Sequence, residues 1–174
     1  MAISRHDVGC WIVKSNPAVF DYHGSVADEA EPAVHPSRWS VSAASRRPAL
    51  IRQGDLVALW LTGSRNPGIY EFGRVTSDGA LDWPDGFDAV PAVDVERAAQ
   101  PCLGVEYDAV RLTRATYLPR EVIKQTPELQ LCEQLRAPRM SNPSYLTRSE
   151  TAALACLLAD RVPDDLLSRV GWHA

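Results

Sequence analysis

Two short segments carry side chains that could hold a flat, polar ligand. Lys14, Ser15 and Asn16 follow an apolar run near the start of the chain, and the Asn16 amide offers a donor and an acceptor together. Trp39, followed by Ser40, stands outside any long apolar run, and its indole presents a face on which a planar ring can stack. Both features have ordinary alternatives, because Asn16 could cap the following turn and tryptophan is usually well buried. The residue types indicate either a site for a planar ligand or a cap and a core residue.

Three further features could extend such a site. Trp60 ends the apolar run 56–61, so it is either a second aromatic wall or a core residue. Residues 136–148 contain three arginines and no acidic residue, and Asn142 lies within them. A second basic cluster follows Trp39. Guanidinium groups at the rim of a site favour phosphate, although solvated loops of this composition are equally common. The candidate phosphate contacts are Arg46, Arg47, Arg136 and Arg139.

The motifs of common catalytic and metal sites are missing from the sequence. It contains no Gly-x-Ser-x-Gly elbow, no phosphate-binding glycine loop and no His-Glu-x-x-His. The 4 cysteines form no Cys-x-x-Cys pair, and no two of the 4 histidines stand four residues apart. We therefore expect no enzymatic activity, no metal ion and no cofactor.

The overall charge argues against a protein that holds nucleic acid mainly by its phosphates. The net charge is −4, whereas such proteins are usually strongly basic because counterion release drives their binding. A site that recognises one base within a small basic rim stays compatible with this charge. No apolar run approaches the length of a membrane span, and the N-terminus lacks an export signal, so we expect a cytoplasmic protein that does not enter membranes.

The predicted strands lie in the first two thirds of the chain. Residues 9–14 and 56–61 are apolar runs typical of buried strands, and residues 69–75 would return antiparallel to the second run. Residues 107–117 alternate between apolar and polar side chains, as a half-exposed strand does. Residues 77–104 are weakly patterned and are predicted as a long surface loop. A further loop is predicted over residues 23–36, and it would carry Trp39 at its end.

Helices are predicted mainly in the last third. Short segments begin near Pro119 and Thr126, and Thr147 with Glu150 forms a capping box before a helix over residues 152–160. A last helix is predicted over residues 164–170. Strands in the centre and helices near the end indicate an α+β fold. A chain of 174 residues suits one domain, and we place its core at about residues 9–160, with 161–174 as a C-terminal extension.

Several of these segments recur together, in the same order, in a known family. They are Lys14-Ser15-Asn16, Trp39-Ser40, Gly54-Asp55 before the strand that ends at Trp60, and Leu146-Thr147 with Glu150. This arrangement resembles the EVE domain, over about residues 9–160. The family has a PUA-like fold and is related to the YTH domains, which read methylated adenine in RNA. The resemblance implies a curved, partly closed β-barrel with flanking helices, which binds a flipped, modified nucleobase and catalyses no reaction.

The resemblance also assigns roles to individual residues. It makes Trp39 a wall of the base pocket and Asn16 a hydrogen-bond partner of the base edge. The implied base-binding residues are Lys14, Ser15, Asn16, Trp39, Ser40, Trp60 and Asn142, with Arg46, Arg47, Arg136 and Arg139 facing phosphates. Two segments depart from the family: residues 40–48 lack its usual aromatic and amide side chains, and residues 77–104 have no counterpart. The departures leave open which base is read.

The resemblance favours modified cytosine in DNA, because bacterial EVE domains often accompany modification-dependent restriction. The chain has no nuclease motif of its own, so a separate nuclease or modification enzyme would be its partner. Two alternatives stay open. One is a reader of a modified base in RNA. The other is a module that binds a small molecule or a protein and has no nucleic-acid role.

Overall fold

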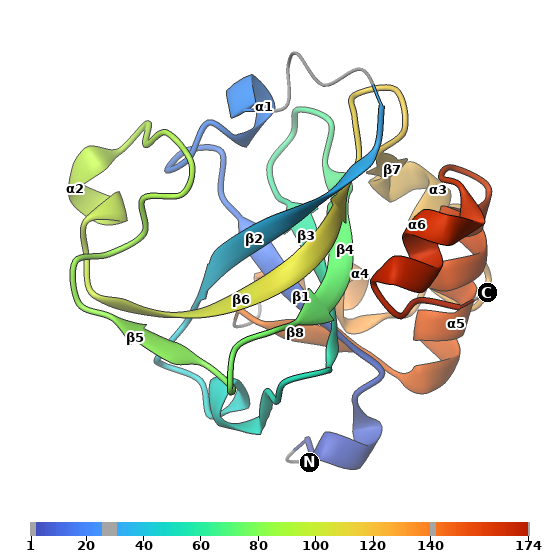
Figure 1. The fold of residues 1–174 in the computed structure, drawn as a ribbon, viewed down its shortest axis with the longest axis horizontal. Helices are drawn as coiled ribbons and strands as arrows, with labels where there is room; N and C mark the ends of the chain where they lie inside the picture. Colours follow the sequence, from blue (N-terminus) through green and yellow to red (C-terminus); the bar gives the residue numbers. More distant parts are fainter. Residues whose placement is uncertain (1–2, 26–30, 140–141, 174) are drawn as a thin grey trace.

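The strands form one mixed sheet that curls around an aromatic interior (Figure 1). The computed structural model describes residues 3–25, 31–139 and 142–173. The sheet order is β2-β6-β4-β3-β1-β8, with β5 beside β6 and β7 beside β4. The strands are β1 (Cys10–Ser15), β2 (Ala33–Val41), β3 (Leu56–Leu61), β4 (Gly68–Val75), β5 (Leu81–Trp83), β6 (Cys102–Arg111), β7 (Leu118–Pro119) and β8 (Ser144–Leu146).

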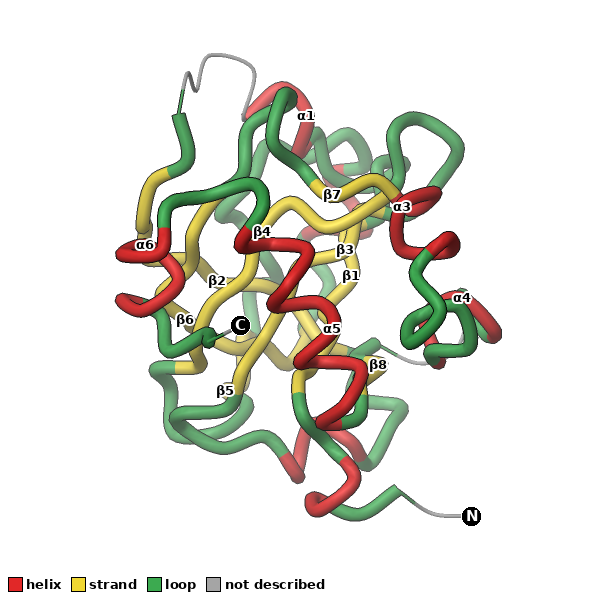
Figure 2. The backbone as a smooth tube through the Cα atoms, turned by 90° about the vertical axis from the view of Figure 1, so that its right-hand side faces the viewer, coloured by secondary structure: helices red, strands yellow, loops and turns green. Residues whose placement is uncertain are grey.

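Most helices lie at one side of this sheet (Figure 2). The helices on that side are α3 (Arg120–Gln125), α4 (Glu133–Arg136), α5 (Arg148–Ala159) and α6 (Asp164–Arg169), whereas α1 (Tyr22–Ser25) and α2 (Val95–Ala98) lie apart from them. The α+β class predicted from the sequence is therefore confirmed. None of the described helices combines the length and apolarity that a bilayer crossing requires.

The sheet has a separate core on each face. In β1, Trp11 and Val13 point into the curled interior, whereas Cys10 and Ile12 point to the helices, as the period of two along a strand requires. The outer core extends past residue 160, where the Trp172 indole is 1% exposed and donates to the Gly73 carbonyl at 2.8 Å. Burial on both faces explains why β1 and β3 are unbroken apolar runs.

Side chains join the two sides of the curled sheet at a seam between β1 and β2. No ladder joins β2 to β8 among the described residues, so the barrel is not closed by strand pairing. Instead, the Trp39 Nε1–H donates to the Lys14 carbonyl at 2.8 Å. The Asn142 side chain accepts from the Lys14 N–H at 3.1 Å and donates to the Ser40 carbonyl at 2.7 Å. These three bonds hold the seam.

The strand predictions were right for β1 and for the hairpin of β3 and β4, and wrong for β2 and for the bounds of β6. β3 and β4 pair antiparallel as predicted, and the capping box of Thr147 and Glu150 is present at the start of α5. However, Trp39 lies in β2 rather than on a loop, and β2 already begins within the predicted loop 23–36. β2 contains Pro36 and several polar residues, so its strand propensity is low, and its nine-residue pairing with β6 overrides that propensity.

The segment 77–104 is also more ordered than predicted. It contains β5 and α2, and β6 already begins at Cys102 and ends at Arg111. The Trp83 ring lies so close to Gly104 that a Cβ there would come within 2.1 Å of it. A glycine at this position therefore lets the segment pack onto β6, which its weak sequence pattern does not reveal.

Candidate functional site

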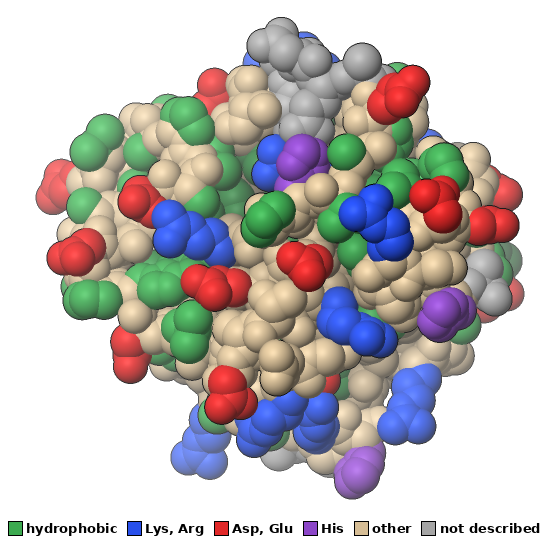
Figure 3. Space-filling view, in the orientation of Figure 1, with side chains coloured by type: hydrophobic (Ala, Val, Ile, Leu, Met, Phe, Trp, Pro, Cys, Tyr) green, Lys and Arg blue, Asp and Glu red, His purple; other side chains and the backbone are tan. Residues whose placement is uncertain are grey.

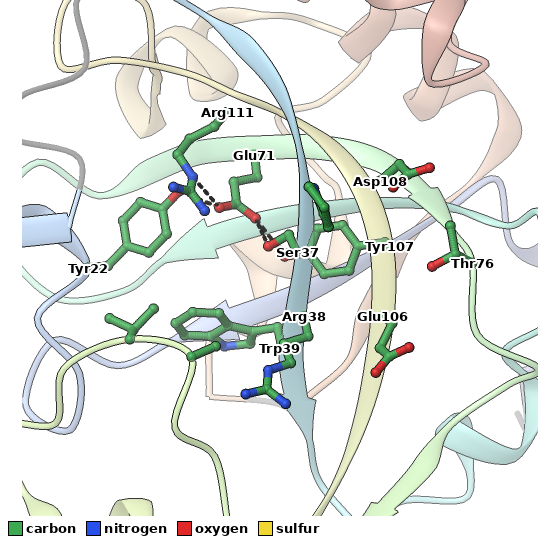
Figure 4. A pocket seen from close by; sticks show the side chains of 13 residues that line it. Tyr22, Ser37, Arg38, Trp39, Glu71, Thr76, Glu106, Tyr107, Asp108 and Arg111 are labelled. Atoms are coloured by element: carbon green, nitrogen blue, oxygen red, sulfur yellow. Dashed lines mark hydrogen bonds and ion pairs between the residues drawn. The ribbon is translucent and has the colours of Figure 1, made fainter.

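A cavity of about 410 Å³ lies beside Trp39, between β2, β6 and the segment that precedes α2 (Figure 4). Trp39 and Tyr22 line it as an aromatic wall, and that segment contributes Ala89 and Val90 to the lining. The surface that carries β2 and β6 has acidic and basic side chains interspersed, without a large patch of one sign (Figure 3).

Trp39 is both a wall of this cavity and part of the inner core. Trp39 is 1% exposed. Its ring centroid lies 4.7 Å from the ring centroid of Phe87 and 5.6 Å from that of Phe20. The Tyr22 ring lies 6.0 Å away, edge-on. The sequence left open whether Trp39 borders a site or belongs to the core, and in the structure it does both.

The floor of the cavity is built around Glu71, a carboxylate that is 1% exposed. Its Oε1 accepts from the Tyr22 hydroxyl at 2.7 Å and from the Arg111 Nε–H at 3.1 Å. Its Oε2 accepts from the Ser37 hydroxyl at 2.7 Å and from the Tyr107 hydroxyl at 2.8 Å (Figure 4). Four donors saturate the two oxygens, which is the arrangement that lets an ionised carboxylate stay buried.

This network fixes the hydrogen-bonding character of the floor. Burial raises the pKa of Tyr22 and of Tyr107 well above the usual value, and the charge of Glu71 raises both pKa values further, so the two phenols keep their protons. Each proton, like that of Ser37, is donated to Glu71. The hydroxyl oxygens of Tyr22, Ser37 and Tyr107 therefore offer a ligand only their remaining lone pairs. The three hydroxyls accept hydrogen bonds from a ligand, whereas the Arg111 guanidinium, which also lines the cavity, can only donate.

The polar residues predicted to read a base edge do not line this cavity. Asn16 is exposed, and its Oδ1 accepts from the Ala18 N–H at 3.0 Å, which is the capping role. Asn142 uses both ends of its amide at the seam, where it bonds the backbone of Lys14 and Ser40. Ser15 is fully buried, and its Oγ has no partner among the described residues.

The predicted phosphate contacts gather near α4, away from Trp39. Arg47 forms a bidentate ion pair with Glu133 at 2.7 Å and donates to the Pro143 carbonyl at 3.1 Å. This pair brings the 46–47 cluster next to the segment that contains Arg136 and Arg139. None of the four arginines lines the Trp39 cavity. Arg139 lines a second cleft instead, together with Trp60.

Sequence reasoning missed the residues of the floor. Glu71 stands alone among apolar residues in β4, and a single carboxylate in a buried strand is a signal that it has partners. The partners themselves could not be found this way. Tyr22, Ser37, Tyr107 and Arg111 come from α1, β2 and β6, and only the pairing of β6 with both β2 and β4 brings them together.

Comparisons with known proteins give the fold. The sequence matches no protein-family model and no curated protein. A hypothetical protein from Leishmania major is similar in structure, with a TM-score of 0.58, 19% identity, and 90% of this chain and 98% of that chain covered. The DUF55 domain of human thymocyte nuclear protein 1 gives a TM-score of 0.52 at 14% identity, covering 87% of this chain and 97% of that domain.

One further structure is less similar. It is human THYN1 protein in complex with 5-methylcytosine containing DNA, with a TM-score of 0.48, 15% identity, and 83% of this chain and 95% of that chain covered. That likeness is too low to bear on the ligand of this chain. The first two structures, with TM-scores above 0.5, share less than 25% sequence identity with this chain, so they establish its architecture alone. The chain therefore shares the overall fold of the DUF55 domain.

Proposed function

We propose that this chain is a non-enzymatic reader of a modified nucleobase, with modified cytosine in DNA as its ligand. The observation that carries the proposal is the cavity beside Trp39, which joins an aromatic wall to a polar floor. Its volume of about 410 Å³ lies within the usual size range of ligand pockets. A base can enter such a cavity only after extrusion from the stack, which costs a few kcal/mol and least in single strands.

The polarity of the floor supports an amino-bearing base. The hydroxyl oxygens of Tyr22, Ser37 and Tyr107 can accept from a ligand because their protons are donated to Glu71. Cytosine presents its N4 amino group as a donor, whereas thymine presents O4 as an acceptor at the same position. A keto oxygen placed against these three hydroxyls would meet their lone pairs, and the lost hydrogen bond would cost about 1–3 kcal/mol.

The apolar wall supports a methylated base over a plain one. Val90 is 8% exposed and lines the cavity together with Trp39. Burying one additional methyl group contributes about 0.8 kcal/mol, which corresponds to roughly a fourfold gain in affinity.

A small molecule that carries amino groups is the second candidate ligand. The exposed carboxylates of Glu106 and Asp108 lie at the cavity, and Arg38 there is paired with Asp88. Such a rim offers little to the phosphates on either side of a flipped base. In the reader function, cleavage or modification of the DNA would require a separate enzyme.

The test compares three single strands that differ at one position, which is 5-methylcytosine, cytosine or thymine, together with free 5-methyldeoxycytidine. We expect the order of affinity 5-methylcytosine, then cytosine, then thymine. Tyr107→Phe removes one acceptor from the floor and should reduce the preference for cytosine over thymine. The matched control is Tyr145→Phe, because Tyr145 is partly buried outside the cavity.

Three outcomes decide between the candidates. Equal affinity for the three strands would contradict the reader function. Binding of the free nucleoside as tight as that of the strand would favour a small-molecule ligand. An unchanged preference in Tyr107→Phe would show that the base is read elsewhere in the chain.

A further inference from the structure

A second cleft, of about 790 Å³, lies at the end of β3, beside α3 and α4. Figure 2 shows these two helices on one side of β1 and β3, whereas β2 and β6, which carry the Trp39 cavity, lie on the other side. No residue lines both the cleft and the cavity. The cleft is therefore a separate site.

The cleft is basic although the chain as a whole is acidic. Arg120, Lys124 and Arg139 line it and are exposed, and none of the described lining residues carries a carboxylate. Glu121 pairs with Arg120 at 3.3 Å and with Lys124 at 3.2 Å, but it is not part of the lining. Exposed pairs of this kind are weak and exchange readily with an anionic ligand. Three cations against one neighbouring carboxylate leave an excess of positive charge.

Among the lining residues of the cleft is a buried donor for which the described residues provide no acceptor. Gln134 is 2% exposed, and its Oε1 accepts from the Ser144 hydroxyl at 2.8 Å. Its Nε2 is buried and has no hydrogen-bond partner among the described residues. A buried amide nitrogen left unpaired costs stability, so a ligand oxygen placed there would recover a hydrogen bond. The amide donor and the cations would both be satisfied by the same kind of ligand, an oxyanion.

We propose that this cleft binds the phosphate group of a ligand, with Arg120, Lys124 and Arg139 around its charge and the Gln134 amide donating to one of its oxygens. Guanidinium groups match phosphate oxygens in geometry, and charge-assisted hydrogen bonds are stronger than neutral ones. Trp60, Leu135 and Pro138 supply an apolar wall beside the phosphate, so a phosphate ester fits the cleft better than the bare ion. The proposal does not depend on the nucleobase-reader function.

Two sources could supply this phosphate, and two probes distinguish them. Inorganic pyrophosphate represents a free phosphorylated compound, and a thymidine hexanucleotide without terminal phosphate represents the backbone of a strand. Each is titrated into the isotope-labelled full chain, and the side-chain amide signals of glutamine are followed by NMR. The signal of Gln134 is assigned by its loss in Gln134→Leu.

The expected result is a saturable shift of the Gln134 amide signal. The double variant Lys124→Gln, Arg139→Gln should weaken binding roughly tenfold or more, because it removes two charge-assisted contacts from exposed positions where folding is unaffected. Arg97→Gln is the matched control, since Arg97 is exposed on α2 and lines neither site. Response to both probes identifies a strand phosphate as the source, and response to pyrophosphate alone identifies a free phosphorylated compound.

Two results would overturn the proposal. One is that neither probe shifts the Gln134 signal. The other is that the double variant and Arg97→Gln lose affinity equally, which would show binding by overall charge alone. The methylated strands and Tyr107→Phe bear only on the reader function, so a failure there leaves this test intact.

Discussion

Glu71 accepts four hydrogen bonds inside the sheet, so its replacement should affect folding as well as ligand binding. Glu71→Gln introduces donors where four donors already converge and leaves Arg111 without its carboxylate. We expect a loss of about 3–5 kcal/mol in the free energy of unfolding, measured by denaturant titration. Glu106→Gln is the matched control, because Glu106 is exposed at the same cavity, and it should change stability by less than about 0.5 kcal/mol. Similar stability in both variants would contradict the buried network.

Lys14 provides a test with a defined pH dependence. Loss of solvent lowers the pKa of Lys14 from its ordinary 10.5 to about 8, while Glu133 raises this pKa and Arg47 lowers it further. The unfolded chain keeps this proton up to about pH 10.5, so the charged side chain destabilises the fold below pH 8, and the penalty disappears as the pH rises toward 10.5.

The prediction for Lys14→Met follows, because the charged Lys14 side chain destabilises the fold below pH 8. The variant should be more stable than the parent at pH 7, and its advantage should shrink by pH 10, measured as the difference in Tm. Lys124→Met is the control, because Lys124 is the other lysine of the chain and is exposed. An advantage of Lys14→Met that stays constant across this pH range would contradict a lowered pKa.

At the residue scale, the sequence predicted the aromatic wall better than the polar partners. A lone Trp39 is recognisable in any sequence, and it does border a cavity. It also packs against Phe20 and Phe87, so Trp39→Ala should cost about 3–5 kcal/mol in the free energy of unfolding. The amides of Asn16 and Asn142 bond the backbone, and sequence alone does not show which way a side-chain amide turns.

At the element scale, Asn142 supplies two of the three side-chain bonds described at the seam between β1 and β2. Asn142→Ala removes the bonds to Lys14 and to Ser40, so we expect a loss of about 1–3 kcal/mol in stability. The Lys14 amide should exchange its hydrogen faster, measured by NMR. Gln125→Ala is the control, because this amide is exposed at the end of α3 and should leave both quantities unchanged. Unchanged exchange at Lys14 in Asn142→Ala would argue against a seam held by this residue.

Elements with a strong local pattern were predictable, and those held by pairing were not. The apolar runs of β1, β3 and β4 and the capping box of α5 are legible in the sequence because burial and capping act over a few residues. β2 forms because nine of its residues pair with β6, and those partners are about seventy residues away. No window of local sequence contains that information.

At the scale of the whole molecule, the charge distribution separates base recognition from backbone recognition. The net charge is −4, and of the two arginines at the Trp39 cavity, Arg38 is paired with Asp88 and Arg111 bonds Glu71. Few cations there can face phosphate. The dependence of affinity on salt should therefore be shallow and correspond to about two to four phosphate contacts.

The most direct measurement is a titration of two single strands, identical except for one 5-methylcytosine, at several salt concentrations. If the Trp39 cavity holds the base, the methylated strand binds more tightly by about the same factor at every salt concentration, and both slopes are shallow. Equal affinities for the two strands, together with a steep dependence on salt, would contradict the account and identify a protein that binds the backbone.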